Sequence, residues 1–174
     1  DYVEFNICNS TPILYRGLFT DVRWVPGMKM VNVTFKNDSS YCWNFYRTFH
    51  QVRGSKEISV VCNSDELEEY VYPVLTIEGA GKSDPVTIKS ISDGGNTMKI
   101  NAYDRLGITI DCQRCTAVDA TTNGIISYVD LGWSDVGNIY WLRLIPGLNT
   151  LEITGDVDVT ISYYAPCKRL GGYA

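Results

Sequence analysis

The feature that most limits the possible folds is an alternating stretch at residues 146–164. In residues 157–163, β-branched and aromatic residues occupy every second position, with polar residues between them. This period of two is typical of a strand that is buried on one face only. Residues 149–154 repeat the pattern, and Gly155-Asp156 separates the two runs. We therefore predict two antiparallel strands joined as a hairpin at this glycine.

Runs with a similar strand signal cover almost the whole chain. They lie at residues 2–8, 13–25 (a bent strand), 29–37, 43–52, 57–63, 72–79, 85–91, 97–103, 107–112, 115–119, 124–131, 139–145, 149–154 and 157–164. Short strands spaced by about ten residues and separated by turn residues are typical of a sandwich or a barrel. Residues 64–69 resemble the first turn of a helix but are too few, so we expect a loop there. The sequence predicts an all-β protein.

A weak domain boundary lies at residues 53–57, where Arg53-Gly54-Ser55-Lys56 interrupts the strand signal. We predict a smaller β element at residues 1–55 and an antiparallel sandwich at residues 56–174. About fifty residues of strand can hardly bury a core of their own. The first element is therefore expected to pack on the sandwich or on another chain.

Charge and hydropathy exclude several classes of partner. The net charge is −5, and the 15 Lys and Arg residues are scattered along the chain without a basic cluster. Nucleic acids and anionic membranes attract clustered cations, so we expect neither as a partner. No apolar run approaches the roughly 20 residues that a membrane-spanning helix needs. We expect no membrane insertion.

The six cysteines do not form a recognisable metal or redox motif. Most stand among apolar strand residues, and we expect reduced, mostly buried thiols. Cys112 and Cys115 form a single C-x-x-C, whereas a structural zinc site needs four ligands. If both lie in one strand they face opposite sides, so they could share a site only across a tight turn. We predict no metal site and no cofactor.

No arrangement of residues indicates catalysis. His50 is the only histidine and lies in a predicted strand, where we expect a structural, hydrogen-bonded side chain. No G-x-S-x-G motif is present. A glycosidase would need two carboxylates across a cleft. None of the many acidic pairs sits in a telling motif: several Asp residues, such as Asp93 and Asp111, stand beside turns or strand ends, and residues 65–69 read as a solvated loop. We predict no catalytic residue.

Three aromatic residues are possible glycan contacts. Trp133, Tyr140 and Trp141 flank a glycine-containing loop, with Asn138 beside them. Proteins that bind sugars often stack pyranose rings on exposed aromatic side chains. The alternative is that these three rings pack in the core or in a subunit interface, and that alternative is the stronger one.

Four segments, taken in order, carry a resemblance to a known family. They are residues 31–43, which include VNVTFK and SSYCW; residues 70–79, YVYPVLTIEG; residues 106–112, LGITIDC; and residues 142–155, LRLIPGLNTLEITG. Together they make the chain similar to the distal tail proteins of siphophage-type tails and related prophages. The first segment resembles the end of the family's N-terminal region, and the other three resemble strands of its C-terminal domain.

The resemblance implies a galectin-like sandwich of the jelly-roll type, preceded by part of a ring-forming domain. It also implies a non-enzymatic baseplate protein at the tail tip of the virion, made in the bacterial cytoplasm. Such a protein forms a hexameric ring and acts as a hub for the tail tube, the tail-tip protein and receptor-binding proteins. A module that binds cell-surface glycans remains the alternative, and a glycosidase fragment is a third, weaker one.

Overall fold

The structure is a computed structural model that describes residues 3–5, 13–37, 41–79, 85–101, 107–133 and 139–168. Its strands are β1 (Val3–Phe5), β2 (Ile13–Val25), β3 (Met30–Asn37), β4 (Cys42–Cys62), β5 (Val74–Glu78), β6 (Val86–Ser90), β7 (Asn96–Ile100), β8 (Gly107–Asp111), β9 (Thr116–Asp119) and β10 (Gly147–Cys167). Every strand pairing is antiparallel. The prediction of an all-β fold is confirmed.

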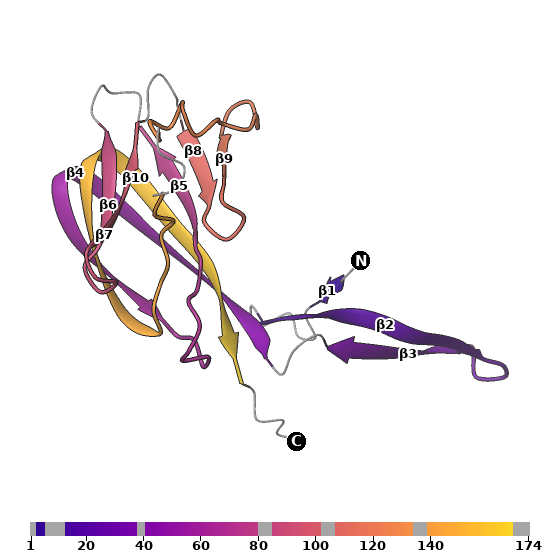
Figure 1. Cartoon of the computed structure of the whole chain (residues 1–174). Helices are drawn as coiled ribbons and strands as arrows, with labels where there is room; N and C mark the ends of the chain where they lie inside the picture. The colour runs from indigo at the N-terminus through magenta and orange to yellow at the C-terminus, as the bar shows by residue number, and fades with distance from the viewer. Residues whose placement is uncertain are drawn as a thin grey trace.

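Two strands of 21 residues, β4 and β10, form the frame of the sandwich (Figure 1). They pair along their whole length, from Gly147 opposite Cys62 to Cys167 opposite Cys42. At the middle of this ladder Gly54 lies opposite Gly155, and both have positive φ angles, of 84° and 149°. Side chains rarely adopt such a backbone, so glycine permits the two strands to change direction together.

The bend divides the remaining strands into two layers. The first half of β10 pairs with β6, which pairs with β7. The second half of β10 pairs with β5, and β8 and β9 continue from β5. The inward side chains of both layers belong to one apolar core, in which the largest fully buried residues are Leu75, Ile77, Ile88, Met98, Ile100, Ile108, Ile110, Leu131, Leu142, Leu144, Leu151 and Ile153.

Residues 151–165 keep the predicted alternation without a break. Leu151, Ile153, Val157 and Val159 all point into the core, although Gly155 stands between them. The predicted hairpin at Gly155-Asp156 is therefore wrong, because β10 runs through this position as one bent strand. The same holds for β4, which joins the strands expected at residues 43–52 and 57–63.

Two further strand predictions are wrong. Residues 124–131 and the described part of residues 139–145 are irregular, with only single bridges from Ile125 to Val118 and from Leu144 to Val71. Their apolar residues enter the core from loops, so burial alone produced the strand signal. No helix occurs among the described residues, in agreement with the loop expected at residues 64–69. The described part of the chain therefore has no helix long and apolar enough to span a membrane.

The expected boundary at residues 53–57 falls inside β4. What leaves the sandwich is a hairpin of β2 and β3, called here the arm (residues 13–37), which projects to one side in Figure 1. It is attached where Ile13 and Leu14 pair with Asn44 and Trp43. The division of the chain into units 1–55 and 56–174 stays a prediction.

Candidate functional site

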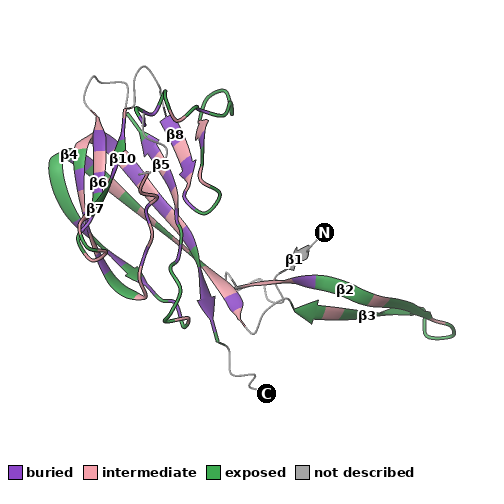
Figure 2. Ribbon diagram, viewed as in Figure 1, coloured by how far each residue is buried: buried purple, intermediate pink, exposed green. Residues whose placement is uncertain are grey.

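The arm differs from the sandwich in how little of it is buried. Figure 2 shows exposed residues along most of β2 and β3, whereas the sandwich strands alternate between buried and exposed. Of the arm residues whose side chains are described, Gly17 alone is buried. Isolated two-stranded hairpins are marginally stable in water. Beyond residues 15–17, where β1 pairs with β2, the arm is such a hairpin, and a further surface to pack against would stabilise it.

A β-bulge puts the apolar residues of the arm on one face. Phe19 pairs with Phe35, but the register shifts before Asp21, so Thr20 is left without a partner in the ladder. Beyond the shift, Val22 pairs with Val33 and Trp24 pairs with Val31. Because a strand alternates sides at every residue, residues 19 and 22 would face opposite sides without this extra residue.

The result is a row of three apolar cross-strand pairs, called here the apolar face. Its members are Phe19, Val22, Trp24, Val31, Val33 and Phe35. The two phenyl rings make an edge contact with centroids 5.5 Å apart. Val22 and Trp24 are 64% and 60% exposed. The opposite face carries the pairs Leu18–Lys36, Asp21–Thr34, Arg23–Asn32 and Val25–Met30, so it is the more polar side of the arm.

The arm also differs in charge from the rest of the chain. It contains Arg16, Arg23, Lys29 and Lys36 but only Asp21 as an acid, a net charge of +3. Since the whole chain carries −5, the remainder carries −8. A cationic arm on an anionic body is the charge distribution that favours contact between the arm of one copy and the body of another.

Gly17 fixes the base of the arm. A Cβ atom at this position would lie 2.1 Å from the Lys36 carbonyl oxygen and 2.7 Å from Cζ of Phe35. Both distances are far below van der Waals contact. Only glycine lets β3 approach so closely that the Phe35 ring covers the backbone at this point.

The residues predicted as glycan contacts lie at the core. Trp133 is 9% exposed, and its indole N–H donates to the Lys99 carbonyl oxygen. Trp141 meets Trp133 edge-on, with centroids 5.0 Å apart, and Tyr128 packs against both rings. Tyr140 is half-buried beside them. The structure thus places Trp133, Tyr140 and Trp141 against the core, and glycan contact by them stays a prediction.

Tyr140 takes part in a hydrogen-bond network with Asp93 and Arg143. Its hydroxyl donates to Asp93 Oδ2 at 2.9 Å, and Arg143 donates to both oxygens of Asp93 at 2.7 and 3.2 Å. The Arg143 guanidinium holds the pKa of Asp93 below its usual value, and burial together with Asp93 raises the pKa of Tyr140 to about 12. Arg143 also lies over the ring of Tyr70, 4.0 Å from its centroid.

The cysteines and the histidine give no catalytic arrangement among the described residues. Cys112 and Cys115 stand at the two ends of the β8–β9 turn, and burial raises the pKa of the Cys112 thiol. The described part of the chain holds no cluster of three or more potential metal ligands. Burial of thiols is confirmed at Cys42, Cys62, Cys112 and Cys167, whereas Cys115 is half-buried and Cys8 lies outside the described residues.

The expectation of a fully hydrogen-bonded His50 is wrong at one atom. The side chain lies on the inner side of β4, and Nε2 is buried without a hydrogen-bond partner among the described residues. Burial and the nearby Lys56 charge lower its pKa. A neutral, core-facing imidazole is the consequence.

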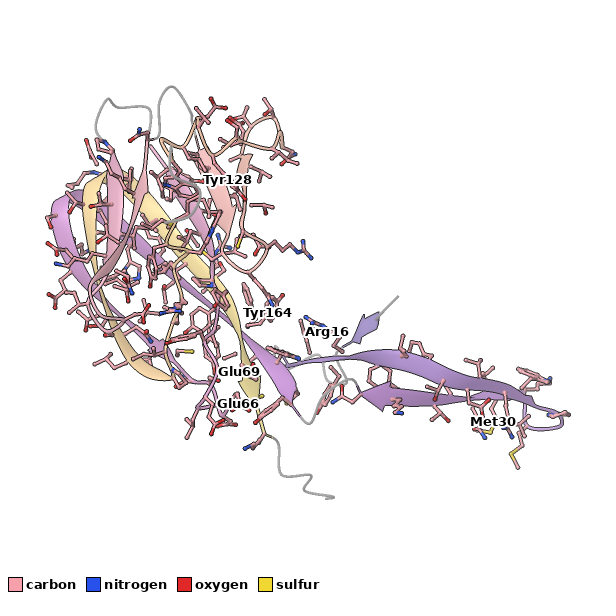
Figure 3. The ribbon with its side chains drawn as sticks, in the orientation of Figure 1. Arg16, Met30, Glu66, Glu69, Tyr128 and Tyr164 are labelled. Atoms are coloured by element: carbon pink, nitrogen blue, oxygen red, sulfur yellow. The ribbon has the colours of Figure 1, made fainter. Side chains whose placement is uncertain are left out.

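A cavity of about 460 Å³ opens where the arm meets the sandwich. We call it the base pocket; its walls include Arg16 of β2, Trp43 and Phe45 of β4, Tyr70 and Tyr72 of the segment before β5, and Tyr164 of β10. Figure 3 shows Arg16, Tyr164 and Glu69 gathered at this junction. Neither this pocket nor the apolar face is visible in the sequence, because the pocket joins distant strands and the face depends on the register of β2 against β3.

Comparison with known proteins agrees with this geometry. A model of the phage tail C-terminal domain family matches residues 32–163. No curated protein matches the chain. The crystal structure of the Dit protein of phage SPP1, described as a paradigm of the hub adsorption apparatus in phages that infect Gram-positive bacteria, is similar with a TM-score of 0.62 and 13% identity. The match covers 95% of this chain and 65% of the SPP1 chain, and confirms the fold.

Two structures of the phage p2 baseplate in its activated conformation, with calcium and with strontium, are also similar. Both have a TM-score of 0.49, at 13% and 12% identity. In each case the match covers 91% of this chain and 66% of the baseplate chain. The chain therefore spans about two thirds of the length of the solved structures it matches.

Proposed function

Because this chain belongs to the phage tail C-terminal domain family, we propose that it is a non-enzymatic structural subunit at the distal end of a phage tail. In this role it assembles with further copies into a ring, for which the expected order is six. The ring joins the tail tube to the tail-tip and receptor-binding proteins. The virion tail is then its place of action.

The observation that carries this proposal is the apolar face of the arm. Three adjacent apolar pairs stand on one side of a projecting hairpin, and the ends of the row, Phe19 and Trp24, are 48% and 60% exposed. A contiguous exposed apolar surface on a protein marks a site where another molecule binds. Burial of such side chains is worth roughly 25 cal/mol per Å² of apolar area removed from water.

The position of this face suits a ring. It lies on a projection at one side of the body, so it can reach a different surface on a second copy (Figure 1). Contacts between unlike surfaces are heterologous, and they close into rings when the rotation permits. The +3 arm and the −8 remainder of the chain add electrostatic complementarity to such a head-to-tail contact.

The domain division forms part of the proposal. The arm and the strand that leads into the sandwich would belong to the ring-forming unit at residues 1–55, and residues 56–174 would form the peripheral sandwich. Partner proteins that must reach the cell surface would then bind around the ring rather than within it.

The test is the molar mass of the chain in solution, measured by sedimentation velocity over a range of concentrations. We expect self-association that rises with concentration. The variant Val22→Ser/Trp24→Ser removes two members of the apolar face and should shift the chain to the monomer. The matched control is Leu18→Ser, which removes an apolar side chain from the opposite face of the same arm and should leave association unchanged.

Two results would contradict the proposal. A chain that stays monomeric at every concentration has no assembly surface in this arm. Equal loss of association in Leu18→Ser and in the double variant would mean that the arm merely needs to be folded. Thermal unfolding of each variant separates a lost contact from a lost fold.

A further inference from the structure

The base pocket gathers four exposed aromatic side chains of the sandwich. Phe45, Tyr70, Tyr72 and Tyr164 are each between 38% and 46% exposed, and all four line this one cavity. Phe45 and Tyr164 come from adjacent strands and contact each other, with centroids 5.1 Å apart. Exposed rings cost free energy in water, so their collection in a single concave site indicates a ligand that covers ring faces.

Trp43 adds a second, independent observation. Its indole ring lines the pocket, and Nε1 is buried yet has no hydrogen-bond acceptor among the described residues. A buried donor left unpaired costs roughly 1–3 kcal/mol. A ligand oxygen supplies the missing acceptor only where binding opens the contacts that bury this N–H.

The charges of the lining favour a neutral ligand. Arg16 and Arg114 contribute two positive charges, and Glu69 and Asp111 contribute two negative charges. An anionic polymer would meet as much repulsion as attraction in such a site. A ligand with many hydroxyl groups can instead donate to the carboxylates and accept from the guanidinium groups.

The backbone pairing beside the pocket leaves a peptide as the competing occupant. β10 is paired on both edges as far as Ser162, with β4 on one side and β5 on the other, whereas Tyr164 is paired with β4 alone. Strand addition, a frequent way to bind an extended peptide, needs a free edge. The experiment below therefore has to distinguish a saccharide from a peptide at Tyr164.

We propose that the base pocket is a binding site for a neutral saccharide. Sugar rings present C–H faces that stack on aromatic rings, and hydroxyl groups that serve both as donors and as acceptors. The volume of about 460 Å³ lies within the range of roughly 300–1,000 Å³ found for small-molecule sites. The proposed assembly role does not depend on this site.

One wall of the pocket is held in place from the core. Arg143, fixed by its two hydrogen bonds to Asp93, lies over the ring of Tyr70. Arg143 does not line the pocket itself, so it is a positioning residue for Tyr70. A ring that is ordered before binding loses less entropy when the ligand arrives.

The experiment is calorimetric titration of the whole chain with neutral trisaccharides, namely maltotriose, cellotriose and chitotriose, together with an array of neutral bacterial surface oligosaccharides. We expect at least one of these to bind. Tyr164→Ala should weaken that binding tenfold or more, and Trp43→Phe, which keeps a ring but removes the N–H, should weaken it by up to about tenfold. Arg143→Met should weaken it while leaving the number of sites at one.

The matched control is Phe49→Ala. Phe49 lies on the same outward side of β4 as Phe45 and is 62% exposed, but it is not part of the pocket. Its replacement should leave saccharide affinity unchanged. The proposal is overturned if no saccharide binds, or if Phe49→Ala weakens binding as much as Tyr164→Ala does.

The saccharide proposal is also overturned if a tail protein binds the pocket through Tyr164 and no saccharide binds there. That result would assign the pocket to a protein partner. Val22→Ser/Trp24→Ser should retain saccharide binding, because those residues lie outside the pocket. Failure of the saccharide site and failure of the assembly surface are therefore separable results.

Discussion

Gly54 lies directly opposite Gly155 at the centre of the β4–β10 ladder, and both residues have a positive φ angle. Two glycines in one cross-strand pair let two long strands bend together without breaking their pairing. The strand partners of β10 change at this point, from β6 before the bend to β5 after it. The pair thus decides where one layer of the sandwich ends and the other begins.

Replacing the two glycines by alanine should have unequal effects. A Cβ at Gly54 would meet nothing within 4 Å, so Gly54→Ala should cost only the backbone strain, about 1 kcal/mol. A Cβ at Gly155 would lie 3.3 Å from Cγ2 of Val86 in addition to the strain, and Gly155→Ala should cost about 2–3 kcal/mol. Urea unfolding measures both changes, and equal destabilisation would contradict this account of the bend.

Gly17→Ala should disrupt the base of the arm while leaving the sandwich folded. The added Cβ would clash with the Lys36 carbonyl and the Phe35 ring, and backbone cannot move aside as a flexible side chain can. We expect faster amide hydrogen exchange across residues 13–37 and unchanged exchange in β5 and β8. The control is Gly27→Ala in the arm's turn, where φ is 92° but a Cβ would meet nothing within 4 Å; exchange near Phe35 should stay slow in that variant.

Asp93 should make the stability of the protein depend on pH in the acid range. Hydrogen bonds from Arg143 lower the pKa of Asp93 in the folded state, so the carboxylate stabilises the fold fully above its unfolded pKa near 3.8. This stabilisation is lost as the pH falls through the lower, folded pKa. Asp93→Asn should remove about 2 kcal/mol at neutral pH and flatten the acid dependence, measured by unfolding at a series of pH values. A variant with an unchanged acid slope would contradict this role.

Cys42 and Cys167 should form a disulfide when the protein is oxidised. They face each other across the β4–β10 ladder with their sulfur atoms 3.1 Å apart. Oxidised glutathione would accept the two electrons, leaving two reduced glutathione molecules and one protein disulfide. Closing so long a loop should stabilise the fold by up to about 4–5 kcal/mol. Peptide mapping without reductant identifies the pair, and Cys42→Ser should abolish both the bond and the stabilisation.

The local sequence pattern predicted most strand positions correctly. It failed where a glycine lies within a bent strand instead of a turn, and where buried residues belong to a loop instead of a strand. Gly155-Asp156 reads as a hairpin turn because glycine breaks most strands, and nothing in the nearby sequence reveals that β4 continues on the other side. Residues 124–131 read as a strand because they are rich in β-branched and aromatic residues, yet Ile126 and Leu131 enter the core from a loop. The spacing of apolar residues indicates which side chains are buried. A residue can be buried without belonging to a strand that is hydrogen-bonded to a neighbouring strand.

The candidate sites were harder to predict than the fold. The apolar face depends on one unpaired residue, Thr20, whose effect is visible only once the register of β2 against β3 is known. From the sequence, core packing is the stronger reading of Trp133 and glycan contact the weaker one, because a glycine-containing loop beside a tryptophan gives no sign of how deeply the ring is buried. The base pocket draws on strands separated by more than a hundred residues, from Arg16 to Tyr164.

By itself, the sequence determined that this protein is an antiparallel sandwich and that every second residue of β10 points inward. Its resemblance to distal tail proteins also predicted a phage tail protein. Those properties follow from side-chain chemistry at a local period, which any chain with the same pattern shares. Only the tertiary structure decided that Gly54 meets Gly155, that the arm has one apolar face, and that aromatic residues converge on a pocket. Each of these is a relation between strands, and the register of non-local backbone hydrogen bonds sets it.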